Sequence, residues 1–118
     1  MLTIGLGEVD GVERILAIRD GVLYGIAKRR DDRVWQCRAL ECADPYASAA
    51  ELSAKWSQGT VAAKGRAWHS QPISEPQAKF LKRLAGKELK TAYILGLKRR
   101  DAADLITHYL AKQALQSM

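Results

Sequence analysis

The chain has 118 residues, an apolar fraction of 47%, and 19 Lys and Arg against 13 Asp and Glu, which gives a formal net charge of +6. Length and apolar content are typical of one globular domain and exclude a wholly disordered chain. The longest apolar run, residues 92–97, is far shorter than the roughly 18 residues that a membrane helix needs. The first ten residues lack the basic start of a secretory signal. We therefore expect a single domain over residues 1–118 in the cytoplasm.

The positive charge lies almost entirely in the second half of the chain. Residues 1–60 carry eight Lys and Arg against nine Asp and Glu, a net charge of −1, whereas residues 61–118 carry eleven against four, a net charge of +7. A surplus of this kind attracts polyanions, so nucleic acid is the first partner to consider. The alternative is a solvated basic face that has no partner.

The first forty residues predict a small antiparallel β-meander. Asp20-Gly21 lies between two apolar segments, and both residue types tolerate the positive φ that a type I′ hairpin turn requires. A second reversal is expected at Asp31-Asp32. The predicted strands cover residues 14–19, 22–28 and 33–40, with an earlier strand over residues 2–6 that adds an edge.

Pairing across these two turns determines which side chains share a face of the sheet. Ile26 is expected opposite Ile15 on one neighbouring strand and opposite Cys37 on the other, because side chains alternate with a period of two. Both faces are partly apolar, so we expect one to be covered and the other to be partly exposed to water. The first face would hold Ile15, Ala17, Tyr24, Ile26, Trp35 and Cys37, and the second Leu16, Ile18, Leu23 and Leu40.

The middle of the chain changes character. Asp44-Pro45 is typical of a helix start, with Asp as the N-cap and Pro as the first helical residue. Residues 47–56 are rich in helix formers and predict a helix. Residues 60–68 are compatible with a short strand or an extended linker. Pro72 and Pro76 bracket the expected junction with an all-helical end.

That helical end has clear local signals. Ser74 and Gln77 have the spacing of a capping box, which starts a helix that Gly86 closes. A final helix is expected over residues 99–113, with an apolar stripe at helical spacing. Residues 89–97 are expected to add a short turn of helix between the two.

The apolar positions of these helices resemble a known module. The pattern is Gln77-x-x-Phe80-Leu81-x-x-Leu84, a spacer, and then Leu97-x-x-x-x-Ala102-x-x-Leu105-Ile106. Residues 74–113 thereby resemble a two-helix module found at the ends of bacterial and phage DNA-processing proteins, including some helicases and exonucleases. Lys98 departs from the pattern, which has Thr or Ser there as a helix cap. The resemblance implies a DNA-associated context, in replication, repair, a phage or a mobile element, and no particular activity.

Basic side chains of the two helices are the candidates for phosphate contacts. Helix N-terminal amides attract phosphate, so Arg99 and Arg100 would act beside a favourable backbone dipole. Without a phosphate, the same cations at a helix N-terminus are mildly unfavourable. The predicted nucleic-acid-binding residues are Lys79, Lys82, Arg83, Lys87, Lys98, Arg99 and Arg100, together with Arg66 and Trp68 from the preceding segment.

Aromatic residues give a second, weaker signal. Tyr24 and Trp35 share a sheet face and are flanked by cations such as Lys28, an arrangement that resembles a stacking platform for single strands. In a small domain, however, a Trp and a Tyr more often belong to the core. We assign Trp35 and Trp56 to the core and take Trp68 as the better candidate for a contact.

No pattern in the chain indicates catalysis or a metal site. Cys37, Cys42, His69 and His108 do not have the close paired spacing of zinc ligands. No set of acid, base and nucleophile is recognisable. We therefore expect no enzymatic activity, no cofactor and no bound metal.

Together these patterns predict an α+β protein with a small antiparallel meander, a crossing helix and a basic helical pair, in which residues 1–70 form a mixed part and residues 71–118 a helical part. Its expected function is to bind nucleic acid, with DNA as the first candidate, mainly through the phosphate backbone. The alternative is a protein–protein adaptor or accessory subunit of a DNA replication, repair or phage assembly, with the sheet face or the Tyr109 helix as the contact. A homodimer or larger assembly fits both, and no membrane association is expected.

Overall fold

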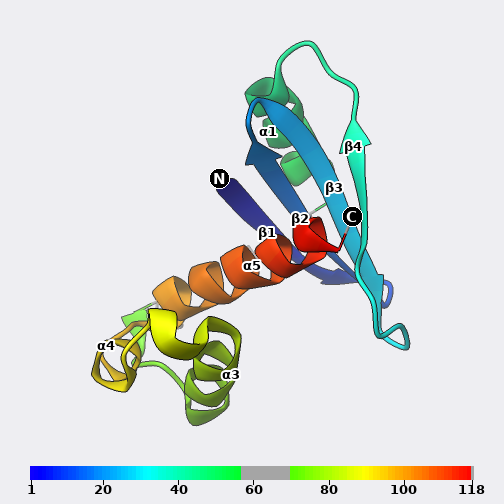
Figure 1. Cartoon of the computed structure of the whole chain (residues 1–118). Helices are drawn as coiled ribbons and strands as arrows, with labels where there is room; N and C mark the ends of the chain where they lie inside the picture. The colour runs from blue at the N-terminus through cyan, green and yellow to red at the C-terminus, as the bar shows by residue number, and fades with distance from the viewer. Residues whose placement is uncertain (57–69, 118) are drawn as a thin grey trace.

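The structure, a computed structural model, describes residues 1–56 and 70–117 (Figure 1). Within these ranges a four-stranded antiparallel sheet in the order β1-β2-β3-β4 is followed by helices, which confirms the predicted α+β architecture. The strands are β1 (Leu2–Val9), β2 (Val12–Arg19), β3 (Val22–Arg29) and β4 (Gln36–Leu40). The helices are α1 (Pro45–Trp56), α3 (Glu75–Ala85), the 3₁₀ turn η1 (Gly86–Glu88), α4 (Thr91–Leu95) and α5 (Arg99–Gln116).

Two Asp–Gly pairs close the first two hairpins. Asp20 and Gly21 have φ values of 53° and 76°, positive at both positions as the predicted turn requires. Asp10 and Gly11 repeat this geometry with φ values of 54° and 77°. The second pair extends the edge strand to Val9, beyond the predicted end at residue 6.

The predicted register is confirmed. Ile26 pairs with Ile15 on β2 and with Cys37 on β4. Strand β4 begins at Gln36 and not at the predicted residue 33, so the preceding Trp35 lies in the connection from β3.

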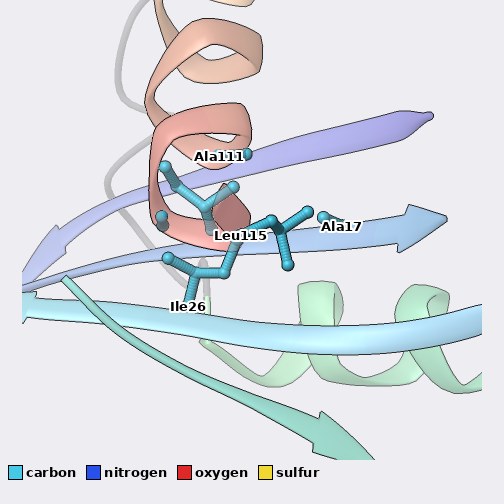
Figure 2. Close-up of a cluster of buried hydrophobic side chains, with 6 residues drawn as sticks. Ala17, Ile26, Ala111 and Leu115 are labelled. Atoms are coloured by element: carbon cyan, nitrogen blue, oxygen red, sulfur yellow. The ribbon is translucent and has the colours of Figure 1, made fainter. Parts of the chain in front are cut away.

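Each face of the sheet carries a helix. On the first face, Ala17 and Ile26 pack against Ala111 and Leu115 of α5, and Figure 2 shows these side chains meeting between helix and strands. On the second face, Ala49 of α1 is buried among apolar side chains of the first three strands. These are Leu6, Leu16, Ile18 and Leu23.

Both faces thus carry a helix, and the second face is open beside α1. A pocket of about 520 Å³ lies there, and its lining includes Arg14, Leu40 and Leu52. Asp44 caps the start of α1 as predicted, because its carboxylate accepts hydrogen bonds from the amides of Tyr46 and Ala47 at 3.1 and 3.2 Å.

Helix α5 joins the sheet to the helical end of the molecule (Figure 1). Its first half contributes Ala102, Leu105 and Ile106 to a cluster with Leu81 of α3 and Ile94 of α4. Its last turns lie on the sheet, and this part extends past the predicted end at residue 113.

Small residues allow α5 to approach the sheet closely. Ala111 is fully buried at the contact. On β1, a Cβ added to Gly5 would lie 2.8 Å from the Thr107 hydroxyl oxygen, closer than such atoms approach in folded proteins. Gly5 is therefore required by the position of α5.

None of the helices within residues 1–56 and 70–117 is both long and apolar enough to cross a membrane. The predicted extended segment over residues 60–68 lies outside the described residues, and so does the side chain of Trp56.

Candidate nucleic-acid interface

The starts of α3 and α5 are tied together. The Ser74 hydroxyl accepts a hydrogen bond from the Gln77 amide at 3.3 Å, and the Gln77 side-chain oxygen accepts from the Ser74 amide at 3.2 Å, which confirms the predicted capping box. The Gln77 Nε2 also donates to the carbonyl oxygen of Arg99 at 3.4 Å. One side chain thus caps α3 and contacts the first residue of α5.

The segment before α3 pairs with the segment that leads into α5. The Ile73 amide donates to the Leu97 carbonyl at 3.0 Å, and the Arg99 amide donates to the Gln71 carbonyl at 2.9 Å. The Arg99 Nε also donates to the Pro72 carbonyl at 3.1 Å. Arg99, predicted as a phosphate contact, is therefore partly buried and holds this junction together.

The neighbours of Arg99 have a different environment. Lys98 is the N-cap residue of α5, with an extended backbone and no capping hydrogen bond from its side chain. Arg100 is the second residue of the helix and is exposed, as Lys98 is. Together they give the start of α5 two cations that point into solvent.

On α3, the predicted basic residues also divide by environment. The Lys82 Nζ donates to the carbonyl oxygens of Gly86 and Leu89 at 3.0 and 2.7 Å, so it satisfies backbone groups just beyond the helix C-terminus. Lys79 forms an exposed ion pair with Glu75, with 3.0 Å between the charged atoms.

Arg83 and Lys87 complete the basic surface of α3. Arg83 is exposed, and its guanidinium carbon lies 5.2 Å from the centroid of the Phe80 ring. Lys87, in η1, is exposed as well. Within the described part of the chain, the side chains of Lys87, Lys98 and Arg100 form no hydrogen bond or ion pair.

The structure therefore sorts the predicted site residues into three groups. Lys82 and one N–H group of Arg99 donate to backbone carbonyls, and Lys79 forms an exposed ion pair. Arg83, Lys87, Lys98 and Arg100 are available to an incoming anion. Arg66 and Trp68 lie outside the described residues.

Glu88 in η1 is the acidic centre of a small polar cluster. Its carboxylate accepts a hydrogen bond from the Tyr109 hydroxyl at 2.9 Å and lies 3.5 Å from the Lys112 Nζ. The Tyr109 bond, followed by the Lys112 charge, lowers the pKa of Glu88. Burial, followed by the bond to Glu88, raises the pKa of Tyr109. Tyr109 is thus hydrogen-bonded within the chain.

The sheet aromatics lie mostly against the protein. Tyr24 and Trp35 pack beside the cluster that α5 covers, and both remain partly exposed. The Lys28 Nζ lies 5.8 Å from the Trp35 ring centroid, and the Arg19 guanidinium carbon lies 5.5 Å from that of Tyr24. The faces on which bases would stack are therefore limited by α5 and by the protein's own cations.

Two exposed side chains on α4 were not singled out from the sequence. Tyr93 is 55% exposed and Leu95 is 62% exposed, whereas Ile94 between them is buried. The sequence feature that indicates them is the run of adjacent apolar residues at 92–95, which cannot all lie on one face of a helix. Adjacent residues of a helix point in different directions, so when Ile94 is buried Tyr93 and Leu95 point away from it.

Within residues 1–56 and 70–117, acidic and thiol groups do not gather into a further site. Among the residues that the structure describes, no three His, Cys, Asp or Glu side chains lie together as a metal site would require. Cys37 and Cys42 are free thiols, and burial raises the pKa of Cys37.

A scan against models of known protein families finds no match, and comparisons with curated proteins and with solved structures find none either. The case for a function therefore rests on the residues and their geometry.

Proposed function

We propose that this protein binds nucleic acid without catalysing a reaction on it, that the nucleic acid is DNA, and that the start of α5 contacts the phosphate backbone. The observation that carries the proposal is the pair of exposed, unpartnered cations at that helix start, Lys98 and Arg100. Cations at a helix N-terminus oppose the backbone dipole and are tolerated best where an anion neutralises both.

The backbone of α5 supports this assignment. The amides of Arg100 and Asp101 belong to the first turn, where no helical carbonyl is available to accept from them. Lys98 supplies no side-chain cap. A phosphate oxygen at this position would accept from these amides and would lie beside two cationic side chains. Asp101 offsets part of the positive charge.

The distribution of charge also favours binding at the helical end. Among described residues, the sheet end, 1–56, has eight Lys and Arg against nine Asp and Glu, a net charge of −1. The helical end, 70–117, has nine against four, a net charge of +5. Among the described residues, a polyanion is therefore attracted more strongly to the helical end than to the sheet end.

Arg83 and Lys87 extend the surface beyond the start of α5. Both are exposed on α3 and η1, whose cluster with α5 forms the core of the helical end. Contacts between cations and phosphates position a protein on the nucleic-acid backbone and carry little information about the base sequence. The resemblance of residues 74–113 to a module of DNA-processing proteins supports a role as an accessory factor in replication, repair or a phage or mobile element.

Binding of the full chain to labelled single-stranded DNA, duplex DNA and RNA, measured by fluorescence anisotropy at low salt, tests the proposal. The double variant Lys98→Ala/Arg100→Ala should bind at least about tenfold more weakly, because it removes two cations that neutralise phosphates. The matched control is Arg29→Ala/Arg33→Ala, which removes two exposed cations from the sheet end. An equal loss of affinity in both variants would indicate attraction by net charge alone and would overturn the assigned site.

A further inference from the structure

An open groove of about 690 Å³ lies between α3 and α4. Ile73, Ala78 and Ile94 contribute apolar surface to its lining. Leu95 lines the same groove and is 62% exposed, although it belongs to a residue type that is usually buried. The groove thus has an apolar interior and an apolar side chain that the chain itself leaves in water.

The rim of the groove is basic. Lys79, Lys82 and Arg83 line it from α3, and Glu75 is the only carboxylate among the described residues of the lining, so these side chains give a net charge of +2. The Lys82 ammonium donates to the carbonyls of Gly86 and Leu89 just beyond α3, so Lys79 and Arg83 are the rim cations that an incoming group can reach. The Lys79–Glu75 pair is exposed, so an incoming carboxylate can replace Glu75 at small cost.

We propose that this groove docks an acidic amphipathic helix of a partner protein. Apolar side chains spaced three and four residues apart on such a helix would lie on Leu95 and on the half-buried Ile73 and Ala78. Its acidic side chains would then meet the rim at Lys79 and Arg83. Docking would cover the apolar surface and neutralise the rim together.

Charge and chemistry distinguish this occupant from two others. A second copy placed on the groove by two-fold symmetry would bring its own Lys79 and Arg83 toward the same basic rim. A phosphate backbone fits the charge of the rim but leaves the apolar lining and Leu95 uncovered, and the described lining residues include no aromatic ring on which a base of a single strand could stack. An acidic helix with an apolar stripe satisfies both features.

This inference does not depend on nucleic-acid binding at the start of α5. The two surfaces share Arg83 at their border, whereas Lys98 and Arg100 are absent from the groove lining. An occupied groove would remove Arg83 from the phosphate-binding surface and leave the cations of α5 free. A docked partner would therefore reduce the affinity for nucleic acid without abolishing it.

The test uses the full chain and a labelled helical peptide of about 16 residues, long enough to form a helix in water. The acidic peptide carries Leu at helical spacing, Glu beside the Leu stripe and Ala at the remaining positions, because like charges four residues apart destabilise an isolated helix. A second peptide replaces each Glu by Lys, and a third replaces each Leu by Ser. We expect saturable anisotropy with the acidic peptide, and binding at least about tenfold weaker with each of the others.

Variants assign the binding to the groove. Leu95→Ser and Arg83→Glu should each weaken binding of the acidic peptide at least about tenfold, because one removes apolar contact and the other reverses a rim charge. Val34→Ser is the matched control, since Val34 is 67% exposed and lies far from α4 in the sequence. Leu95 is exposed, so its replacement should leave the melting temperature unchanged.

Four results would overturn the proposal. They are no saturable binding of the acidic peptide, equal binding of the acidic and basic peptides, full affinity in Leu95→Ser, and equal reductions of affinity in Leu95→Ser and Val34→Ser. Self-association that Leu95→Ser abolishes would assign the groove to a second copy, and DNA affinity abolished by Leu95→Ser would assign it to nucleic acid. Loss of DNA binding in Lys98→Ala/Arg100→Ala alone bears on the proposed function and leaves this inference intact.

Discussion

The guanidinium of Arg99 donates a hydrogen bond to the carbonyl oxygen of Pro72, with 3.1 Å between Nε and the oxygen. This bond gives Arg99 a role different from that of Arg100, although the two are adjacent in the sequence and identical in type. Arg99 holds the segment before α3 against the start of α5, whereas Arg100 is exposed.

Replacing Arg99 by Ala should therefore lower the free energy of unfolding by about 1 kcal/mol, the usual net contribution of one hydrogen bond. Arg100→Ala should leave stability unchanged or slightly raised, because it removes an unfavourable cation from a helix N-terminus. Thermal unfolding followed by circular dichroism measures both. Equal melting temperatures for the two variants would show that the Arg99–Pro72 bond contributes nothing.

The sheet was largely predictable because its signals are local. Asp20-Gly21 determines one hairpin, and a side-chain period of two then determines the cross-strand partners of β2 and β3, including Ile15 with Ile26. The register shift between Gly5 and Gly7 in the pairing of β1 with β2 has no such local signal. The second Asp–Gly pair, Asp10-Gly11, carried the same signal and gives the longer edge strand. The capping box at Ser74 was also predictable, because it depends only on residues three positions apart.

The division of the basic residues was not predictable from local sequence. Lys82 and Arg99 donate to carbonyls that the folded chain brings near them, and nothing in the adjacent sequence distinguishes them from Arg83 or Arg100. The extension of α5 onto the sheet is likewise a tertiary effect. Ala111 is too small and weakly apolar to indicate a buried position from the sequence alone, and it is buried because α5 packs against the strands.

Gly5→Ala should lower the free energy of unfolding by about 1–3 kcal/mol, the usual cost of overpacking. The added methyl group would lie 2.8 Å from the Thr107 hydroxyl oxygen. Thr107→Ala removes that oxygen, so Gly5→Ala should cost clearly less in the Thr107→Ala background. Urea denaturation of the four proteins in the cycle measures the coupling. Additive losses of stability would contradict the close approach of β1 and α5.

The bond between Tyr109 and Glu88 should make stability depend on pH at both extremes. Because the folded-state pKa of Glu88 lies below its ordinary value of 4.5, its contribution is present above pH 4.5 and is lost as pH falls through the lowered pKa. Because the folded-state pKa of Tyr109 is raised above its ordinary value of 10.0, its contribution is present below pH 10 and is lost as pH rises through the raised pKa.

Melting temperatures of the wild type, Glu88→Gln and Tyr109→Phe across this range check the prediction. At neutral pH the wild type should be the most stable of the three. Its advantage over Glu88→Gln should shrink in acid, and its advantage over Tyr109→Phe should shrink at high pH. Differences in melting temperature between the wild type and the variants that stay constant with pH would show that neither ionisation is linked to folding.

Trp35→Ala should reduce stability by about 2 kcal/mol, less than the roughly 3–5 kcal/mol of a fully buried Trp, because the ring packs beside the α5-covered cluster but remains partly exposed. Affinity for single-stranded DNA should not change. Thermal unfolding and anisotropy on the same preparation separate the two effects. An unchanged melting temperature with a loss of binding would place the nucleic-acid site on the sheet.

The most direct test of nucleic-acid binding at the start of α5 is the salt dependence of duplex DNA affinity from about 50 to 200 mM salt, compared between the wild type and Lys98→Ala/Arg100→Ala. The slope of log K against log salt should be negative in the wild type. It should become shallower by about 0.9 for each phosphate that the variant no longer neutralises, and therefore by nearly 2 in the double variant. A flat wild-type slope would contradict phosphate binding, and an unchanged slope in the double variant would contradict its location at Lys98 and Arg100.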